Sequence, residues 1–185
     1  METTYIVGGG PSLKNFDWAL LKNKNCIAVN LAFRKIPDAK AIYFSDVRFW
    51  LWYSSELLSH GSTLYTGAKS IPHPSVIKYR FSGLKGLDTR PNKLKHGKSS
   101  GYAAINLAYH LGARKIILLG FDLNDCTHWH EEEYPIRSKE KSIPIMLEYF
   151  PFLVEPLKRE GIEIINANPS SAIECFKKAN IHDVF

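Results

Sequence analysis

Three consecutive glycines end an apolar run near the start of the chain, in the stretch YIVGGGPSLK. The stretch lacks the Gly-Lys-Ser/Thr of a P-loop and the third glycine of a dinucleotide-binding fingerprint. Glycine permits positive φ angles and close approach of a ligand to the backbone, and proline followed by serine suits the start of a helix that faces an anion. A tight turn without a ligand is the alternative. We predict that Gly8, Gly9, Gly10, Pro11 and Ser12 bind the phosphate of a nucleotide.

A second candidate anion site is the stretch KSSGYAAIN at residues 98–106. Two serines and a glycine stand at the start of the clearest helical pattern of the chain, and several lysines precede them. Backbone N–H groups, hydroxyls and the positive end of a helix dipole together attract a phosphate. A simple serine N-cap would explain one serine but not the pair with the lysines. We predict that Ser99, Ser100 and Gly101 contact the nucleotide phosphate.

A third group of reactive residues lies in GFDLNDCTHWHEEEYP, residues 120–135, where His128 and His130 are two positions apart. An H-x-H pair on an extended segment points to one side, which suits a divalent metal with Asp122 or Asp125 as a further ligand. In a loop, the same pair offers a metal-free general base. Surface histidines are the third interpretation, and the run of glutamates at 131–133 fits a solvated face. The candidate catalytic residues are therefore His130, His128 and Asp122.

The composition bounds the class of protein. The chain has 185 residues, of which 45% are hydrophobic and 23% charged, and its formal net charge is +6. These values predict one globular domain over residues 1–185 and fit an anionic small-molecule ligand. Signatures of an RRM, KH or helix-turn-helix domain are absent, which makes nucleic acid an unlikely partner. Three separated cysteines without C-x-x-C predict a reduced, cytoplasmic protein, and no apolar run reaches the length of about 20 residues that spans a membrane.

Short apolar runs alternate with helical patterns along the chain, and this alternation predicts how the candidate residues are positioned. We expect strands at residues 4–9, 25–30, 41–46, 62–67, 115–122 and 162–168, and helices at 18–23, 48–58, 100–112, 144–161 and 170–179. Residues 68–99 are expected to be mostly loop, with a short strand at 76–81. The order predicts an α/β, Rossmann-like fold: a mostly parallel sheet with helices on both faces.

Ligands of such sheets bind beyond the carboxyl ends of the strands. Small or polar residues follow nearly every predicted strand, and this ring is the predicted binding site. Its members are Gly8 to Ser12, Asn30, Ser45, Asp46, Thr66, Asp122 and residues 166–170.

These motifs together resemble a known family. The turn GGGPSLKNFDWALL, the AVN and YFSD segments that follow, the pair Ser100–Gly101 and the Gly-Phe-Asp ending at Asp122 resemble the small Rossmann-like sialyltransferases that use CMP-sialic acid. The same pattern is similar to the broader family of 6-hydroxymethylpterin diphosphokinase-like proteins. Its short phage-encoded members, of unassigned function, are the most similar, since a His-Trp-His segment after Gly-Phe-Asp is typical of them.

The resemblance implies roles for individual residues. The matched glycine turn, Asn30 and Ser100 would contact the CMP part of the donor, and His130, which precedes EEEYPI, would be the counterpart of the lid histidine that acts as general base. Asp46 stands at or near the position of a nucleotide-contacting asparagine, where a carboxylate would bind a ribose hydroxyl or a metal. The segment between Asp122 and His130 is too short to carry the lid tyrosines of the sialyltransferases.

We therefore expect a nucleotide- or nucleotide-sugar-binding transferase with a histidine general base and no certain cofactor besides the nucleotide donor. One alternative is a metal-dependent diphosphotransferase or phosphohydrolase, in which His128, His130 and Asp122 hold a divalent metal. The other is a non-enzymatic phage accessory or assembly protein that keeps the fold. The sequence indicates neither donor, acceptor nor oligomeric state.

Overall fold

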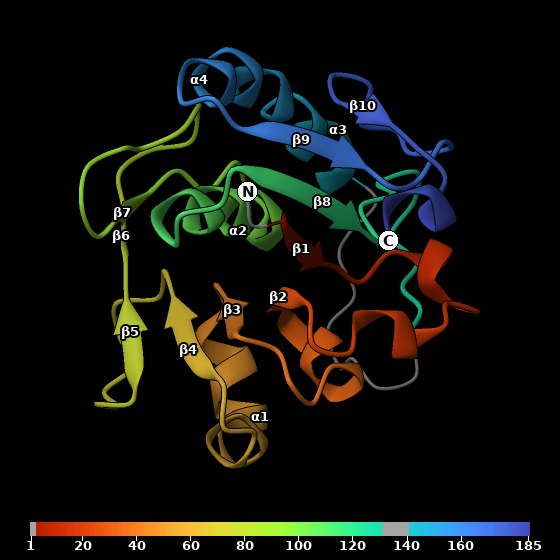
Figure 1. The fold of residues 1–185 in the computed structure, drawn as a ribbon. Coiled ribbons are helices and arrows are strands. Elements are labelled where there is room, and N and C mark those ends of the chain that lie inside the picture. Colours follow the sequence, from red (N-terminus) through yellow and green to blue (C-terminus); the bar gives the residue numbers. More distant parts are fainter. Residues whose placement is uncertain (1–2, 131–140) are drawn as a thin grey trace.

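The structure is a computed structural model that describes residues 3–130 and 141–185. Its main element is an eight-stranded sheet in which all paired strands run parallel, in the order β10-β9-β8-β1-β2-β3-β4-β5 (Figure 1). The strands are β1 (Thr3–Val7), β2 (Asn25–Val29), β3 (Ala41–Phe44), β4 (Thr63–Thr66), β5 (Val76–Lys78), β8 (Lys115–Leu119), β9 (Glu163–Asn166) and β10 (Lys177–Lys178). Two short strands, β6 (Arg80–Phe81) and β7 (Lys93–Leu94), pair separately. The predicted parallel α/β architecture is confirmed.

Helices cover both faces of the sheet. The α-helices are α1 (Val47–Ser59), α2 (Ser100–His110), α3 (Ser142–Leu147) and α4 (Val154–Arg159), and the 3₁₀ helices are η1 (Pro11–Leu13), η2 (Trp18–Leu21), η3 (Asn30–Lys35), η5 (Phe150–Leu153) and η6 (Ile181–Val184). Within the described ranges, no helix is long and apolar enough to cross a lipid bilayer.

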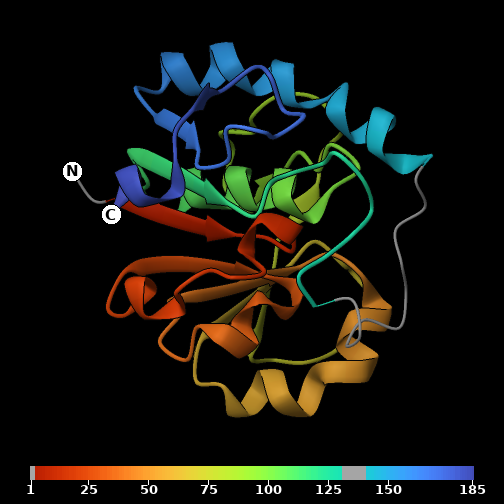
Figure 2. The same ribbon diagram turned by 90° about the vertical axis from the view of Figure 1, so that its right-hand side faces the viewer.

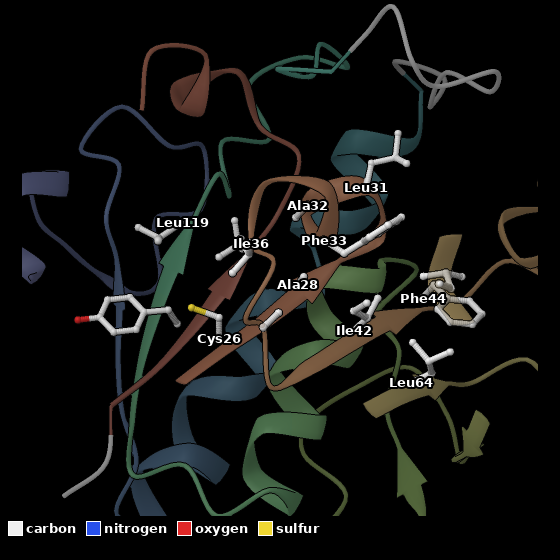
Figure 3. Close-up of a cluster of buried hydrophobic side chains, with 14 of the residues drawn as sticks. Cys26, Ala28, Leu31, Ala32, Phe33, Ile36, Ile42, Phe44, Leu64 and Leu119 are labelled. Carbon is white, nitrogen blue, oxygen red and sulfur yellow. The ribbon is translucent and has the colours of Figure 1, made fainter. Parts of the chain in front are cut away.

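Alternate residues of the central strands build two separate hydrophobic cores. In β1, Tyr5 and Val7 face the core formed with η1, η2, η3 and α1, whereas Ile6 faces the core formed with α2, η5 and α4. In the first core, η3 lies across the sheet and places Phe33 and Ile36 near Ala28 (Figure 3). Near-continuous apolar strands are typical of a sheet that is covered on both faces.

The side on which successive strands are added to the sheet changes between β1 and β8. From β1 the next strands are added on one side, through β2, β3 and β4, while β8 pairs with the other side of β1. Figure 2 shows β1 and β8 pointing toward the same edge of the molecule, where both strands continue into loops. A crevice at such a switch point is the usual ligand site of an open parallel sheet.

Three predicted helices differ from the structure. Residues 18–23 contain only the short 3₁₀ helix η2. Asp17 caps it, since its carboxylate accepts a 3.0 Å hydrogen bond from the Ala19 N–H. The helix expected over 144–161 is divided into α3, η5 and α4, because proline at 151 and 156 interrupts the hydrogen-bonding pattern. Residues 170–179 form no helix and instead pair briefly with β9 through β10.

The loop between β6 and α2 is held against α2 by buried polar groups. The fully buried Asn106 side chain accepts hydrogen bonds from the N–H groups of Asp88 (3.0 Å) and Lys95 (3.1 Å). The Tyr102 hydroxyl accepts a 2.7 Å bond from the N–H of Gly86. Asp88 is itself 4% exposed and binds the Arg90 guanidinium at 2.7 Å. These bonds fix the residues that lead into α2, and hence the position of its first turn.

Asp88→Asn should lower the free energy of unfolding at neutral pH by about 1.5–3 kcal/mol, the usual contribution of a hydrogen bond to a charged group. Arg90 holds the pKa of the Asp88 carboxyl well below its usual range. Because the folded-state pKa is depressed, the stabilisation is fully present above the unfolded pKa of about 3.9 and is lost as the pH falls toward the folded value. Denaturant titrations at neutral and acidic pH should therefore show a difference between variant and wild type that narrows in acid. A difference independent of pH would contradict this assignment.

Candidate functional site

A cavity of about 800 Å³ lies beyond the carboxyl ends of β1, β2, β3 and β8. It collects residues that are far apart in the sequence, from the turn after β1 to the segment after β8. Of the residues predicted from the sequence, those that line it are Gly8, Gly9, Gly10, Pro11, Asn30, Ser45, Asp46, Ser99, Ser100, Gly101, Asp122, Asp125 and His128. Among the described residues, the predicted ones that do not line the cavity are Ser12, Thr66, His130 and residues 166–170.

The glycine turn is built differently from the prediction. Gly8, Gly9 and Gly10 do not adopt positive φ, and Gly10 has an extended conformation with φ −63°. The helix expected after Pro11 is only the three-residue η1, which is too short to present a helix dipole. The turn is instead fixed to β8, because the Gly8 N–H donates to the Leu119 carbonyl at 2.8 Å. The expectation of a left-handed turn opening a phosphate-binding helix is wrong.

Packing within the protein explains two of the three glycines. A Cβ on Gly8 would lie 2.8 Å from the Gly120 carbonyl oxygen, and one on Gly10 would lie 1.8 Å from an Asp122 carboxylate oxygen. Gly101, at the start of α2, likewise leaves space for the Phe121 ring, which a Cβ would approach to 2.6 Å. Real Cβ atoms do not occur at such separations, so these glycines permit the close contact between β1, β8 and α2.

Asp122 binds groups of the protein itself. Its carboxylate accepts hydrogen bonds from the Ser12 N–H (3.0 Å), the Ser12 hydroxyl (2.8 Å) and the Asn168 amide (2.9 Å). Burial raises the pKa of the Asp122 carboxyl, and the bonds from Ser12 oppose that shift. Ser12 therefore uses its hydroxyl to anchor the turn and not, as predicted, to face a ligand. Asp122 is positioned to hold the glycine turn against the end of β8.

The first turn of α2 forms the cationic wall of the cavity. Gly97 and Lys98 both have positive φ, 45° and 60°, and this sharp bend directs the N-terminus of α2 into the cavity. Ser99 is the N-cap residue, and its side chain makes no capping hydrogen bond within the described structure. The exposed Lys98 adds a positive charge beside the unsatisfied N–H groups of the helix. This wall is suited to an anion such as a phosphate.

Asp46 and Arg48 form an ion pair on the opposite side of the cavity. The Asp46 carboxylate caps α1 through the Arg48 N–H at 2.8 Å and binds the Arg48 guanidinium at 2.6 Å. Hydrogen bonds from Arg48 lower the pKa of Asp46, so the carboxylate is ionised and its charge is balanced locally. The repulsion that an isolated carboxylate would exert on a phosphate is thereby reduced.

Asn30 follows β2 directly and has a left-handed backbone, with φ 52°. Asparagine tolerates this conformation better than most residues, and the bend turns the chain from β2 into η3. The half-buried side chain lies on the cavity wall as the sequence predicted. Its amide has both a donor and an acceptor, which is the chemistry needed to contact a base or a ribose.

The His-Trp-His segment, residues 128–130, packs against the glycine turn. His128 is half-buried and lines the cavity, whereas His130 is only 5% exposed. The two imidazole rings lie side by side with centroids 5.1 Å apart. The segment at 128–130 contains a turn and is not an extended strand, and of the two histidines only His128 lines the cavity.

A metal centre finds no support in the described residues. Within 3–130 and 141–185, no three His, Cys, Asp or Glu side chains are grouped closely enough to hold a metal ion. The proposed set of His128, His130 and Asp122 therefore does not form a ligand cluster, and Asp122 is bound to Ser12 and Asn168. The glutamates at 131–133 lie outside the described residues.

Sequence reasoning missed several residues that line the cavity. Arg48, Phe81, His96, Ile143 and Met146 also line it. Phe81 and His96 form a ring pair with centroids 4.6 Å apart, and burial lowers the pKa of His96. Neither residue follows a strand of the main sheet, so the search for polar residues at strand ends did not select them. Arg48 lies two positions after the predicted residue Asp46, in the first turn of α1.

The fold is similar to that of known sialyltransferases. The sialyltransferase CstII from Campylobacter jejuni, in complex with the substrate analogue CMP-3FNeuAc, matches with a TM-score of 0.56 and 17% identity over 97% of this chain and 85% of that chain. CstII in complex with a trisaccharide acceptor and CMP matches with a TM-score of 0.55 and 15% identity over 95% and 85%. At this level of identity, the likeness shows a shared fold. The sequence matches no protein-family model and no characterised protein at a significant level.

Proposed function

We propose that this protein is a nucleotide-sugar-dependent transferase of the glycosyltransferase type, with the donor bound in the cavity beyond β1 and β8. The single observation that carries the proposal is the content of that cavity: a cationic helix N-terminus with Lys98 on one wall and the imidazole of His128 on another. The likeness to sialyltransferase structures that contain CMP or a CMP-sugar analogue supports the same interpretation.

In this proposal the donor phosphate lies against the first turn of α2, where Ser99, Ser100 and Lys98 neutralise and bind it. Asn30 contacts the ribose or base. The bond between the sugar anomeric carbon and the phosphate oxygen breaks, and its electron pair leaves with the nucleotide. The acceptor hydroxyl oxygen bonds to the anomeric carbon and gives its proton to His128. We assign the general base to His128 rather than to His130, because His128 lines the cavity.

Isothermal titration calorimetry with a panel of nucleoside mono- and diphosphates, CMP included, tests the pocket. Release of nucleotide from the matching nucleotide sugars then tests the reaction. Binding of at least one nucleotide together with nucleotide release is expected. A protein that binds none of the panel would favour the non-enzymatic alternative, and release abolished by EDTA would favour the metal-dependent one.

Ser100→Ala should weaken binding of the best nucleotide by about 0.5–1.5 kcal/mol, the usual net contribution of one hydrogen bond. The matching nucleoside, which lacks the phosphate, should bind both proteins equally. Ser55→Ala provides the matched control, because Ser55 is exposed on α1 and does not line the cavity. An equal loss for nucleoside and nucleotide would show that the Ser100 hydroxyl does not contact phosphate.

Membership among the phage-encoded pterin diphosphokinase-like proteins, a cytoplasmic location and organisation as one domain stay predictions. They do not affect the assignment of the cavity.

A further inference from the structure

Two hydrogen bonds attach Trp129 to the glycine turn. The Trp129 backbone N–H donates to the Gly9 carbonyl at 3.0 Å, and its indole Nε1–H donates to the Gly8 carbonyl at 3.2 Å. The segment after β8 is therefore bound to the turn after β1 by both its backbone and its side chain. The same two glycines line the cavity.

The third glycine of the turn is explained by this contact. A Cβ on Gly9 would lie 2.6 Å from Cδ2 of His128 and 2.9 Å from Nε2 of His130. Both imidazole rings thus occupy the space that a side chain at position 9 would fill. Gly8 and Gly10 permit the approach of β8, whereas Gly9 permits the approach of the two histidines.

Aromatic packing holds Trp129 from the other side. Its ring lies 5.1 Å from the ring of Trp18 on η2 and meets the His130 ring edge-on at 4.7 Å. The Lys35 ammonium lies 6.0 Å from the ring centroid, within reach of a cation–π contact. Because rings pack on the indole and both the indole N–H and the backbone N–H of Trp129 are hydrogen-bonded, the side chain has one defined position. Because His128 and His130 are its chain neighbours, their positions are defined with it.

We propose that Trp129 is a positioning residue, which seats the His-Trp-His segment on the glycine turn so that His128 faces the cavity and His130 is buried. This inference rests on the proposed function for the role of His128 and goes beyond it, because it gives the glycine turn a second task. Gly8 and Gly9, which line the cavity, then also hold the segment that carries the general base.

Two different substitutions should disturb the position of the His-Trp-His segment on the glycine turn. Trp129→Phe removes the indole N–H and keeps an aromatic ring, and Gly9→Ala fills the space beneath the imidazoles. Carbethoxylation by diethyl pyrocarbonate, located by mass spectrometry, measures the reactivity of each histidine without any substrate. In the wild type, His128 should react and His130 should be protected. His130 should react about 2- to 10-fold faster in Trp129→Phe, as expected for loss of one hydrogen bond, and at least as fast in Gly9→Ala.

Turnover provides the second readout. Both variants should lower kcat for nucleotide-sugar cleavage by at least about 2- to 10-fold, the factor expected for the labelling rate. In Trp129→Phe, the KM for the donor and the melting temperature should be nearly unchanged. Trp52→Phe is the control, since Trp52 is 41% exposed on α1 and does not line the cavity, and it should change neither quantity. Unchanged protection of His130 in both variants would overturn the inference. An inactive wild type would refute the proposed function alone, because the labelling pattern does not require catalysis.

Discussion

Replacement of His128 by alanine should lower the turnover number of nucleotide-sugar transfer by about 10²- to 10⁴-fold, the range expected for loss of a general base. Donor affinity should change little, because in our proposal the phosphate is bound at the first turn of α2. Activity of the wild type should fall in acid, since a protonated imidazole cannot accept the proton of the acceptor. Steady-state kinetics over a range of pH, with donor binding measured by calorimetry, check both expectations.

His130→Ala is the matched comparison for this prediction. His130 is 5% exposed and packs against Trp129, so its loss should act through stability and through the position of the segment. The turnover number per folded molecule should fall much less than in His128→Ala. Equal losses in the two variants, with a stoichiometric metal that each variant loses and with activity removed by chelation, would instead establish a metal pair. The acid profile alone does not decide, because protonation also releases a metal from histidine.

The sequence predicted the sheet well for a physical reason. Each central strand is a short run of β-branched, aliphatic or aromatic residues that ends at a glycine or a polar residue. Few secondary structures other than a buried parallel strand fit that pattern. Gly112, the predicted end of the helix before β8, has φ 86° as a C-cap glycine should. The C-terminal part was harder, because the apolar residues between 144 and 179 have helical spacing but prolines at 151 and 156 set the actual ends. Over residues 144–161 the two prolines, a local signal, divide the helix. Over residues 170–179 a tertiary contact decides, since β10 pairs with β9.

The position of the site was predictable, but the task of each residue was not. The rule that ligands of parallel sheets bind beyond the strand ends identified the glycine turn, Asn30 and the start of α2, all of which line the cavity. The glycines, however, were interpreted as space for a ligand, and the structure fills that space with Asp122 and the histidines. A sequence shows that a side chain is missing but not which neighbour approaches. The same limit applies to Ser12, whose partner is 110 positions away.

Whether the glycine turn serves the fold or the ligand is decided by Gly10. A Cβ at this position would lie 1.8 Å from Oδ2 of Asp122 and 2.7 Å from the Gly120 carbonyl oxygen, so Gly10→Ala must displace the end of β8 or break the hydrogen bonds that Ser12 donates to Asp122. Overpacking of this kind costs about 1–3 kcal/mol and sometimes more, and because backbone is involved we expect about 3 kcal/mol or above.

A double-mutant cycle identifies the cause of that loss. Asp122→Ala alone should cost about 2 kcal/mol, because it leaves the Asn168 amide and the Ser12 N–H without their acceptor. In the double variant the Cβ of residue 10 no longer meets a carboxylate, so the combined loss should be smaller than the sum by about 1 kcal/mol, within the range of coupling between residues in contact. Some loss should persist, since the Gly120 carbonyl is still present. Urea denaturation of the four proteins measures the cycle. If Gly10→Ala instead unfolds like the wild type and loses only nucleotide affinity, the missing side chain serves the ligand, and our account of the turn as a packing contact between β1 and β8 is wrong.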